Sequence, residues 1–321
     1  MRKRTFLSLA VALIGSRVAR ASTAYPDRPI RFVVHAAPGG WLDLTTRVVA
    51  QAMSEHLGQP VMMDNRAGAD GLIGIRYVKD AAPDGYTVLA CASTIALRPA
   101  LKLDPGYALE KDFVGVGPMA ASPFLMLSSP SLRYRTLGEY VAWAHANPTK
   151  LNYASPGVGS QAHILGELVS RHVGVKIVDV PYKGVGAALP DVMSGRQNFI
   201  FGAAGASLPS VREGRLRCLG VTTSKRLVSA MDLPTLAEQG MAGMNFHQYV
   251  GLMVPSGVPR DVIERLSDAL KAATASPALR ARFTADGAEA MAATPDEFTE
   301  FVRQDARRMA KVVADIGLAK E

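Results

Sequence analysis

The chain has 321 residues, of which 36 are basic and 28 acidic, which gives a formal net charge of +8. Residues 1–21 hold five of the basic residues and no acidic one, so the remainder carries 31 minus 28, or +3. This small excess, without a basic run interleaved with aromatic side chains, argues against nucleic-acid binding. About 300 residues are enough for a large core and for more than one domain.

The first 24 residues have the pattern of a signal peptide. A basic start precedes an apolar run at 6–15, and Ala19-Arg20-Ala21 supplies a small-residue cleavage signal. We therefore expect a signal peptide over 1–24, cleaved after Ala21 or Ala24. The apolar run is too short to span a bilayer, and no later stretch approaches eighteen apolar residues. The mature protein is expected to be soluble and exported.

From Tyr25 onward, strand and helix patterns alternate. Strands are expected at 30–34, 61–63, 86–91, 151–154, 175–180, 197–201 and 216–221, and helices at 43–57, 71–80, 136–146, 161–172, 184–195, 259–274, 277–286 and 295–316. Two extended runs, 113–127 and 249–254, are expected to cross between lobes. This alternation predicts an α/β protein with mostly parallel sheets.

A glycine turn follows the first strand. Pro38, Gly39 and Gly40 break the strand, and Asp43 is placed to cap the next helix. Backbone N–H groups and the positive end of a helix dipole favour an anion such as a carboxylate. The turn lacks the Gly-Lys-Ser/Thr of a nucleotide P-loop. An ordinary turn without a ligand is the alternative.

A second glycine turn, Gly157-Val158-Gly159, also follows a strand and opens a helix. It suits a small anion in the same way. With Ala162 and the later Asp179 it also matches the dinucleotide pattern G-x-G-x-x-A. Pro156 before the turn and Val180-Pro181 after the acid argue against that alternative.

No constellation for catalysis is present in the sequence. There is no G-x-S-x-G motif and no histidine pair at metal-ligand spacing. We therefore expect no enzyme activity, no metal and no cofactor, with an exported enzyme as the alternative. His35 and His163 adjoin the glycine turns, either as structural hydrogen-bond partners or as ligand contacts. Cys91 and Cys218 lie in apolar runs and are expected to be free thiols, a disulfide being the alternative.

Eight sequence blocks carry a resemblance to a known family. They are Tyr25-Pro-x-Arg-Pro-Ile30, Pro38-Gly-Gly-x-x-Asp43, Asn65-Arg-x-Gly-Ala-x-Gly71, Pro83-Asp-Gly-Tyr-Thr87, Tyr153-Ala-Ser-Pro-Gly-x-Gly-Ser160, Val180-Pro-Tyr-Lys-Gly184, Leu233-Pro-Thr-Leu-x-Glu-x-Gly240 and Gly251-Leu-x-x-Pro-x-Gly-x-Pro259. In this order they resemble the substrate-binding proteins of tripartite tricarboxylate transporters, the Bug-type periplasmic receptors. The resemblance covers nearly all the mature chain.

The resemblance implies a type II periplasmic-binding-protein fold. Two α/β lobes joined by two crossover strands, lobe 1 from 25–122 plus 251–321 and lobe 2 from 123–250, would close on a ligand cleft. The implied partners are a small organic carboxylate and the membrane permease subunits of the transporter. We expect a periplasmic monomer.

The resemblance also implies site residues; at the two glycine turns, backbone amides and ordered waters would bind the carboxylate. In lobe 1 the site residues are Ala37, Gly39, Gly40, Asp43, Ser93 and Thr94, and in lobe 2 Ser155, Gly157, Gly159, Ser160, Tyr182 and Lys183. His163 beside the second turn is included with them.

Three departures from the family pattern concern the ligand. Ala36 stands where the family has an aromatic residue, and Trp41 where it has a small one. We hypothesise that Trp41 refills the cleft and favours an aromatic or bulky apolar carboxylate; packing on a neighbouring helix is the alternative. Arg98, where the family has Asn, either adds charge to the site or lies at the surface, and the same alternatives hold for Lys183.

Overall fold

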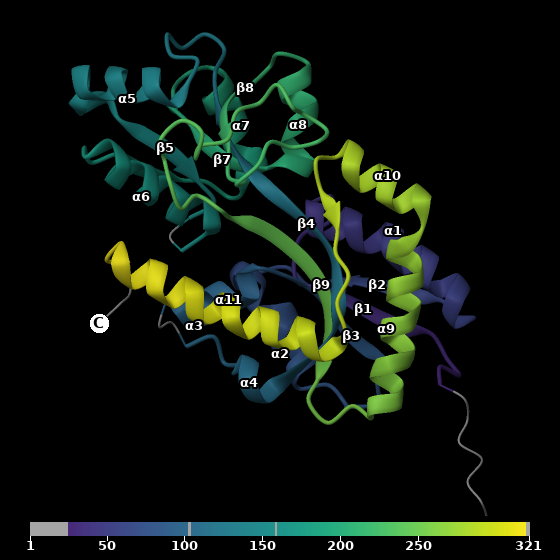
Figure 1. Cartoon of the computed structure of the whole chain (residues 1–321). Coiled ribbons are helices and arrows are strands. Elements are labelled where there is room, and N and C mark those ends of the chain that lie inside the picture. Colours follow the sequence, from purple (N-terminus) through teal and green to yellow (C-terminus); the bar gives the residue numbers. More distant parts are fainter. Residues whose placement is uncertain (1–24, 102–103, 158, 319–321) are drawn as a thin grey trace, which may run out of the picture.

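In the computed structural model, residues 25–101, 104–157 and 159–318 are described. The expected signal peptide lies outside these residues. The described chain forms two α/β lobes joined by long strands, with helices on both faces of the sheet (Figure 1). The predicted α/β class and two-lobe architecture are confirmed.

The first lobe is built on three parallel strands. β1 (Ile30–Val34) lies between β2 (Val61–Asn65) and β3 (Thr87–Ala92). Apart from the exposed Arg31, its side chains are buried on both faces, as expected for a parallel strand between two helical layers. The helices of this lobe are α1 (Trp41–Leu57), the short 3₁₀ turn η1 (Ala69–Gly71), α2 (Leu72–Lys79), α3 (Thr94–Ala100), α4 (Leu109–Asp112), α9 (Arg260–Ala275) and α10 (Pro277–Ala285).

The second lobe repeats this arrangement. β5 (Asn152–Ser155) lies between β6 (Val178–Pro181) and β7 (Ile200–Ala203), in parallel with both. Tyr153 stacks on Phe199 at a centroid distance of 5.4 Å in its core. The remaining elements are α5 (Leu137–Ala146), η2 (Pro148–Lys150), α6 (Gln161–Val173), α7 (Val185–Met193), α8 (Ala204–Arg212) and β8 (Arg217–Val221).

Two strands cross between the lobes, as the extended runs predicted. β4 (Phe113–Ser128) and β9 (His247–Pro255) pair with each other in antiparallel register, from Phe113 opposite Pro255 to Pro123 opposite His247. β9 also pairs with β3, and β4 with β7, β8 and the two-residue β10 (Glu289–Ala290). The sheet therefore runs β2-β1-β3-β9-β4-β7-β5-β6. Its parallel pairs lie in the lobes and its antiparallel pairs at the crossing.

The last helix, α11 (Pro295–Asp315), contacts both lobes (Figure 1). Thr294 and Glu297 form a capping box that begins it. Phe298 and Val302 pack into the core of the first lobe, whereas Met309 and Val313 pack into that of the second. The lobe ranges given above remain a prediction.

Two expectations about helices were wrong. The first helix begins at Trp41 with Gly40 as its N-cap, so Asp43 lies inside the first turn and is not the cap. α3, α4 and α8 were not predicted; α3 and α8 contain Pro99 and Pro209, which ordinarily end a helix. In α3 the carbonyl of Ile95, four residues before Pro99, instead accepts the Tyr107 hydroxyl at 2.7 Å.

Candidate functional site

Four strands end at one edge of their lobe, and a helix begins soon after each. In the first lobe β1 leads to α1 and β3 to α3; in the second, β5 leads to α6 and β7 to α8. Because β1 and β3 are parallel, as are β5 and β7, the helices of each pair begin at the same sheet edge. The first N–H groups of a helix have no partner within it and carry partial positive charge. Both edges are thus suited to an anion.

The two edges meet in the structure. The buried Ser93 hydroxyl donates a 2.9 Å hydrogen bond to the side-chain oxygen of Gln161, which joins the start of α3 to the start of α6. Trp41 reaches α8, since a Cβ atom added at Gly205 would lie 2.8 Å from its Nε1. The expected site residues at the two glycine turns and at Ser93 and Thr94 therefore gather where the lobes meet.

The buried carboxylate of Asp43 stabilises the first glycine turn. It accepts hydrogen bonds from the Gly39 N–H at 2.9 Å, Arg47 Nε at 2.9 Å and Asn65 Nδ2 at 2.8 Å. Burial alone would raise the pKa of this carboxyl, but the three donors outweigh it and hold the pKa below its ordinary value. Asn65 also donates to the carbonyl of Ala36 at 3.2 Å. Asp43 thus orders the turn that presents Ala36, Ala37 and Gly40.

His35 has the structural role that the sequence left open. Its Nε2 accepts the N–H of Ala92 at 3.1 Å, which ties β1 to the end of β3. A Cβ added at Gly71 would lie only 2.3 Å from its Nδ1, so the loop that ends at Gly71 packs directly on the ring. Burial lowers the pKa of His35 to about 4, so the ring is neutral at pH 7.

In the second glycine turn, polar side chains accept hydrogen bonds from nearby backbone N–H groups. Ser155 Oγ accepts the Gly157 N–H at 3.0 Å, and Ser160 Oγ caps α6 by accepting the His163 N–H at 3.2 Å. His163 is buried, and its Nδ1 accepts the Gly159 N–H at 3.1 Å. Both glycines have positive φ, 123° and 83°. Like Asp43, these side chains therefore shape the turn that would meet a ligand.

The acid of the dinucleotide pattern faces the protein interior. The carboxylate of Asp179 lies 3.9 Å from His163 Nε2, and its Oδ1 is shielded from solvent. It is thus not presented at the turn for a ribose, and the dinucleotide alternative loses the contact on which it depends.

The other expected site residues differ in what they touch. Thr94 Oγ1 is shielded from solvent and has no hydrogen-bond partner among the described residues. Tyr182 directs its hydroxyl into the second lobe, donating to Asp191 at 2.7 Å, whereas Lys183 is exposed. Arg98 donates to the carbonyl of Ala69 at 3.2 Å. Gln161 and Gly205 were not predicted as partners of Ser93 and Trp41, because no local sequence pattern marks either residue.

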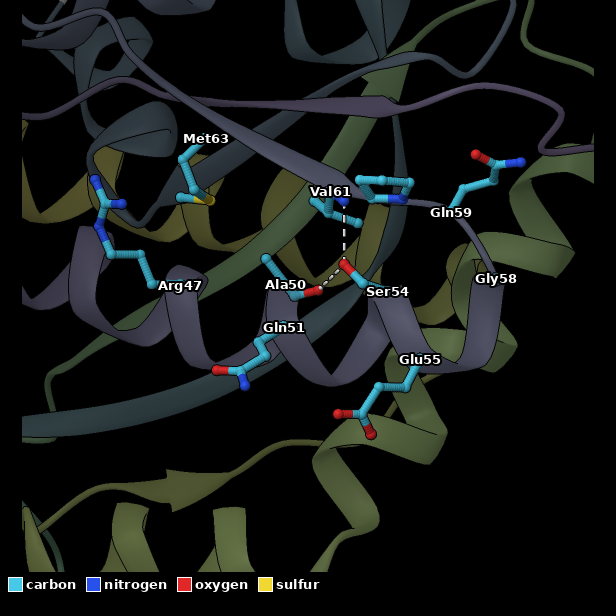
Figure 2. A pocket seen from close by; sticks show the side chains of 10 residues that line it. Arg47, Ala50, Gln51, Ser54, Glu55, Gly58, Gln59, Val61 and Met63 are labelled. Atoms are coloured by element: carbon cyan, nitrogen blue, oxygen red, sulfur yellow. Dashed lines mark hydrogen bonds between the residues drawn. The ribbon is translucent and has the colours of Figure 1, made fainter.

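A surface groove lies away from the glycine turns. It is a groove of about 670 Å³ between the carboxyl end of α1 and the start of β2, the opposite end of the sheet from the glycine turns. Figure 2 shows Gln51 and Glu55 along α1, and Ser54 bonded to Val61 and Ala50. A smaller hollow of about 110 Å³ lies between 227–229 and 284–289.

Neither cysteine is paired, and no metal site is found in the described part of the chain. Cys91 and Cys218 are buried free thiols, as expected. No group of three or more His, Cys, Asp or Glu side chains there is arranged to hold a metal ion. No described helix is both long and apolar enough to cross a membrane.

Two α/β lobes joined by crossing strands form the fold of periplasmic binding proteins. The periplasmic binding protein BugD has the same fold, with a TM-score of 0.84, 29% identity and coverage of 92% of this chain and 100% of that one. A *Rhodopseudomonas palustris* protein solved with adipate, Rpa4515, gives a TM-score of 0.86 at 31% identity over 92% and 99% of the two chains.

The chain belongs to the tripartite tricarboxylate transporter family receptors, whose family model matches residues 45–318. Protein BugT of *Bordetella pertussis* is 34% identical over 313 residues, 97% of this chain and 96% of that protein. The family consists of substrate-binding receptors, so the chain is a solute-binding protein and not an enzyme.

Proposed function

We propose that this protein binds a small organic carboxylate between its lobes, at the two glycine turns. The observation that carries the proposal is the meeting of helix N-termini from both lobes, joined by the hydrogen bond from Ser93 to Gln161. Asp43, Ser155 and His163 already accept the N–H groups of Gly39, Gly157 and Gly159, and Ser160 caps α6. The remaining backbone N–H groups of the turns and bridging waters would therefore contact the carboxylate. The adipate in the *R. palustris* relative supports this ligand class.

Thr94 is the one side-chain hydroxyl we assign to ligand contact. Its Oγ1 is shielded from solvent and lacks a partner among the described residues, although buried hydroxyls are ordinarily hydrogen-bonded. A carboxylate oxygen or a bridging water would satisfy it. Thr94→Val retains the shape and removes the hydroxyl, so it should weaken carboxylate binding.

We further propose that Trp41 limits the shape of the ligand. Its ring is half-buried, packs on the core of the first lobe and reaches Gly205 of the second. A flat apolar wall there would favour an aromatic or bulky apolar acid. If Trp41→Ala leaves the preference between aromatic and aliphatic acids unchanged, this assignment is wrong.

In the cell, we propose that the mature chain is a periplasmic monomer that delivers its ligand to the permease subunits. Family membership supports a transport partner, and the sequence pattern over 1–24 supports export. Cell fractionation, light scattering of the purified protein and ligand uptake by a deletion strain test these three points separately.

A thermal-shift screen of the chain from Tyr25 tests the ligand class. The panel contains aliphatic and aromatic mono-, di- and tricarboxylates, each paired with its neutral amide, and NAD. A ligand at about 100 times its Kd adds roughly 2.7 kcal/mol of stability. Shifts confined to the acids, with the compound recovered intact, support the proposal. Shifts with NAD alone would favour the dinucleotide alternative, and turnover of the compound would indicate an enzyme.

A further inference from the structure

His163 and Asp179 form a buried pair beneath the second glycine turn. His163 Nδ1 accepts the Gly159 N–H at 3.1 Å, so in this arrangement the proton of the neutral ring is on Nε2. Nε2 lies 3.9 Å from Asp179 Oδ2, too far for a hydrogen bond but close enough for a strong charge interaction. The ring is buried, so water cannot readily replace either contact.

Protonation of His163 would reverse this arrangement. Both ring nitrogens of an imidazolium are donors, so Nδ1 could no longer accept the Gly159 N–H. The new charge would be attracted to Asp179, whose Oδ1 is also buried and has no hydrogen-bond partner among the described residues. The Gly159 peptide would be opposed by a donor and would have to move. Leu101 of the other lobe packs against it, since a Cβ at Gly159 would lie 2.4 Å from Leu101 Cδ1.

Two titratable groups, Asp179 and Tyr153, lie beside the imidazole, and a third, Glu167, is linked to it through Tyr153. Asp179 comes from β6, and Glu167 lies one turn along α6. Tyr153 of β5 stacks on the ring at 6.3 Å and donates to Glu167 at 2.7 Å. Burial, together with that hydrogen bond, raises the pKa of Tyr153 far above its ordinary value, so it stays neutral. Asp179 therefore supplies negative charge beside Nε2.

We propose that His163 is a positioning residue that couples ligand affinity to pH. Its neutral ring holds the Gly159 turn in the conformation that binds the carboxylate. Protonation attracts the ring to Asp179 and frees the turn, so the carboxylate is released. This inference rests on the proposed carboxylate site. His35, the corresponding histidine of the first lobe, also accepts a backbone N–H but lies in a site without such an acid described beside it. The release is thus a property of the second lobe.

A pair of substitutions separates this role from a merely structural one. In His163→Asn the side-chain oxygen can occupy the position of Nδ1, so it accepts the Gly159 N–H at every pH. In His163→Gln the acceptor lies farther out, near the position of Nε2, and the bond to Gly159 is lost. Affinity for the best carboxylate is measured by calorimetry at about pH 8 and about pH 5.5, which bracket the ordinary imidazole range.

The wild-type protein should bind about tenfold more weakly at the lower pH. His163→Asn should bind equally well at both values, and His163→Gln weakly at both. If the affinity of His163→Asn falls with pH as much as that of the wild type, the proposal is wrong. Melting curves of both variants show whether they fold.

NMR of the ¹⁵N-labelled protein without ligand tests the coupling between His163 and the Gly159 turn independently of the ligand. The Gly159 amide resonance should titrate together with the His163 ring in the wild type and stay constant in His163→Asn. In Asp179→Asn the midpoint should move to lower pH, because the facing charge is gone. If the chemical shift of the Gly159 amide does not change as His163 titrates, the proposal is wrong, even if carboxylates bind. If no carboxylate binds at either pH, the proposed function fails, while the NMR result still decides the role of His163.

Discussion

Removal of the Asp43 carboxylate should both destabilise the protein and weaken ligand binding. Asp43→Ala deletes three hydrogen bonds, to Gly39, Arg47 and Asn65, at 2.8–2.9 Å. Hydrogen bonds to a buried charge are worth about 1.5–3 kcal/mol each. Gly39 and Arg47 are exposed and can turn to water, and Asn65 keeps its bond to Ala36. We therefore expect a net loss of about 3 kcal/mol.

Chemical denaturation followed by circular dichroism measures this loss. A matched control is Leu44→Ala on the same helical turn, because Leu44 is 47% exposed and its truncation should cost less than about 0.5 kcal/mol. The unfolding free energy of Asp43→Asn should lie between those of the other two variants. The amide keeps the shape of the carboxylate, but its N–H groups would face the donors that the carboxylate accepted. Equal unfolding free energies for Asp43→Ala and Leu44→Ala would refute the view that this carboxylate orders the turn. Carboxylate affinity should fall in the same order.

The remaining predictions concern pH, the lobe contact and the thiols. The pKa of Asp43 is lower in the folded than in the unfolded state, so its contribution to stability is complete above the unfolded-state pKa and is lost as pH falls through the folded-state pKa. The difference in unfolding free energy between wild type and Asp43→Asn, measured in urea, should therefore shrink between about pH 6 and about pH 3. Gly205→Ala places a Cβ 2.8 Å from Trp41 Nε1, so it should weaken ligand binding and increase the radius of gyration seen by X-ray scattering. Burial raises the pKa of Cys91 and of Cys218 to about 12, so both thiols should react with Ellman's reagent only slowly until guanidinium unfolds the chain.

Each of these has its own control. If the difference in unfolding free energy between wild type and Asp43→Asn stays constant across the pH range, the prediction about pH is wrong. The Gly205→Ala effect should largely vanish in a Trp41→Ala background, and additivity of the two changes would contradict the contact. Rapid labelling of native protein, or a mass two units low from a disulfide, would contradict the third.

Much of the fold could be predicted because its signals are local. β-branched runs ended by glycine turns indicate strands, and the long amphipathic stripe of 295–316 indicates the last helix. Both crossing strands were expected from extended apolar runs, and their mutual antiparallel pairing was not. The glycine turns likewise indicated a candidate anion site, because their chemistry belongs to the backbone; binding there stays a prediction.

Other features depended on distant parts of the chain. α3 tolerates Pro99 because Tyr107 occupies the carbonyl that the proline leaves without a donor. Asp43 proved to be an internal support and not a cap because Asn65, 22 residues later, reaches its second oxygen. Neither partner can be recognised from residues adjacent in sequence.

The sequence by itself therefore determined the α/β class, the order of most elements, the two glycine turns and the family. Only the tertiary structure decided which residues meet: Ser93 with Gln161, 68 positions apart, Trp41 with Gly205, and Gly159 with His163 above Asp179. The physical reason is that periodicity and turn chemistry act over a few residues, whereas a contact between lobes is fixed by how two sheets are joined through β4 and β9.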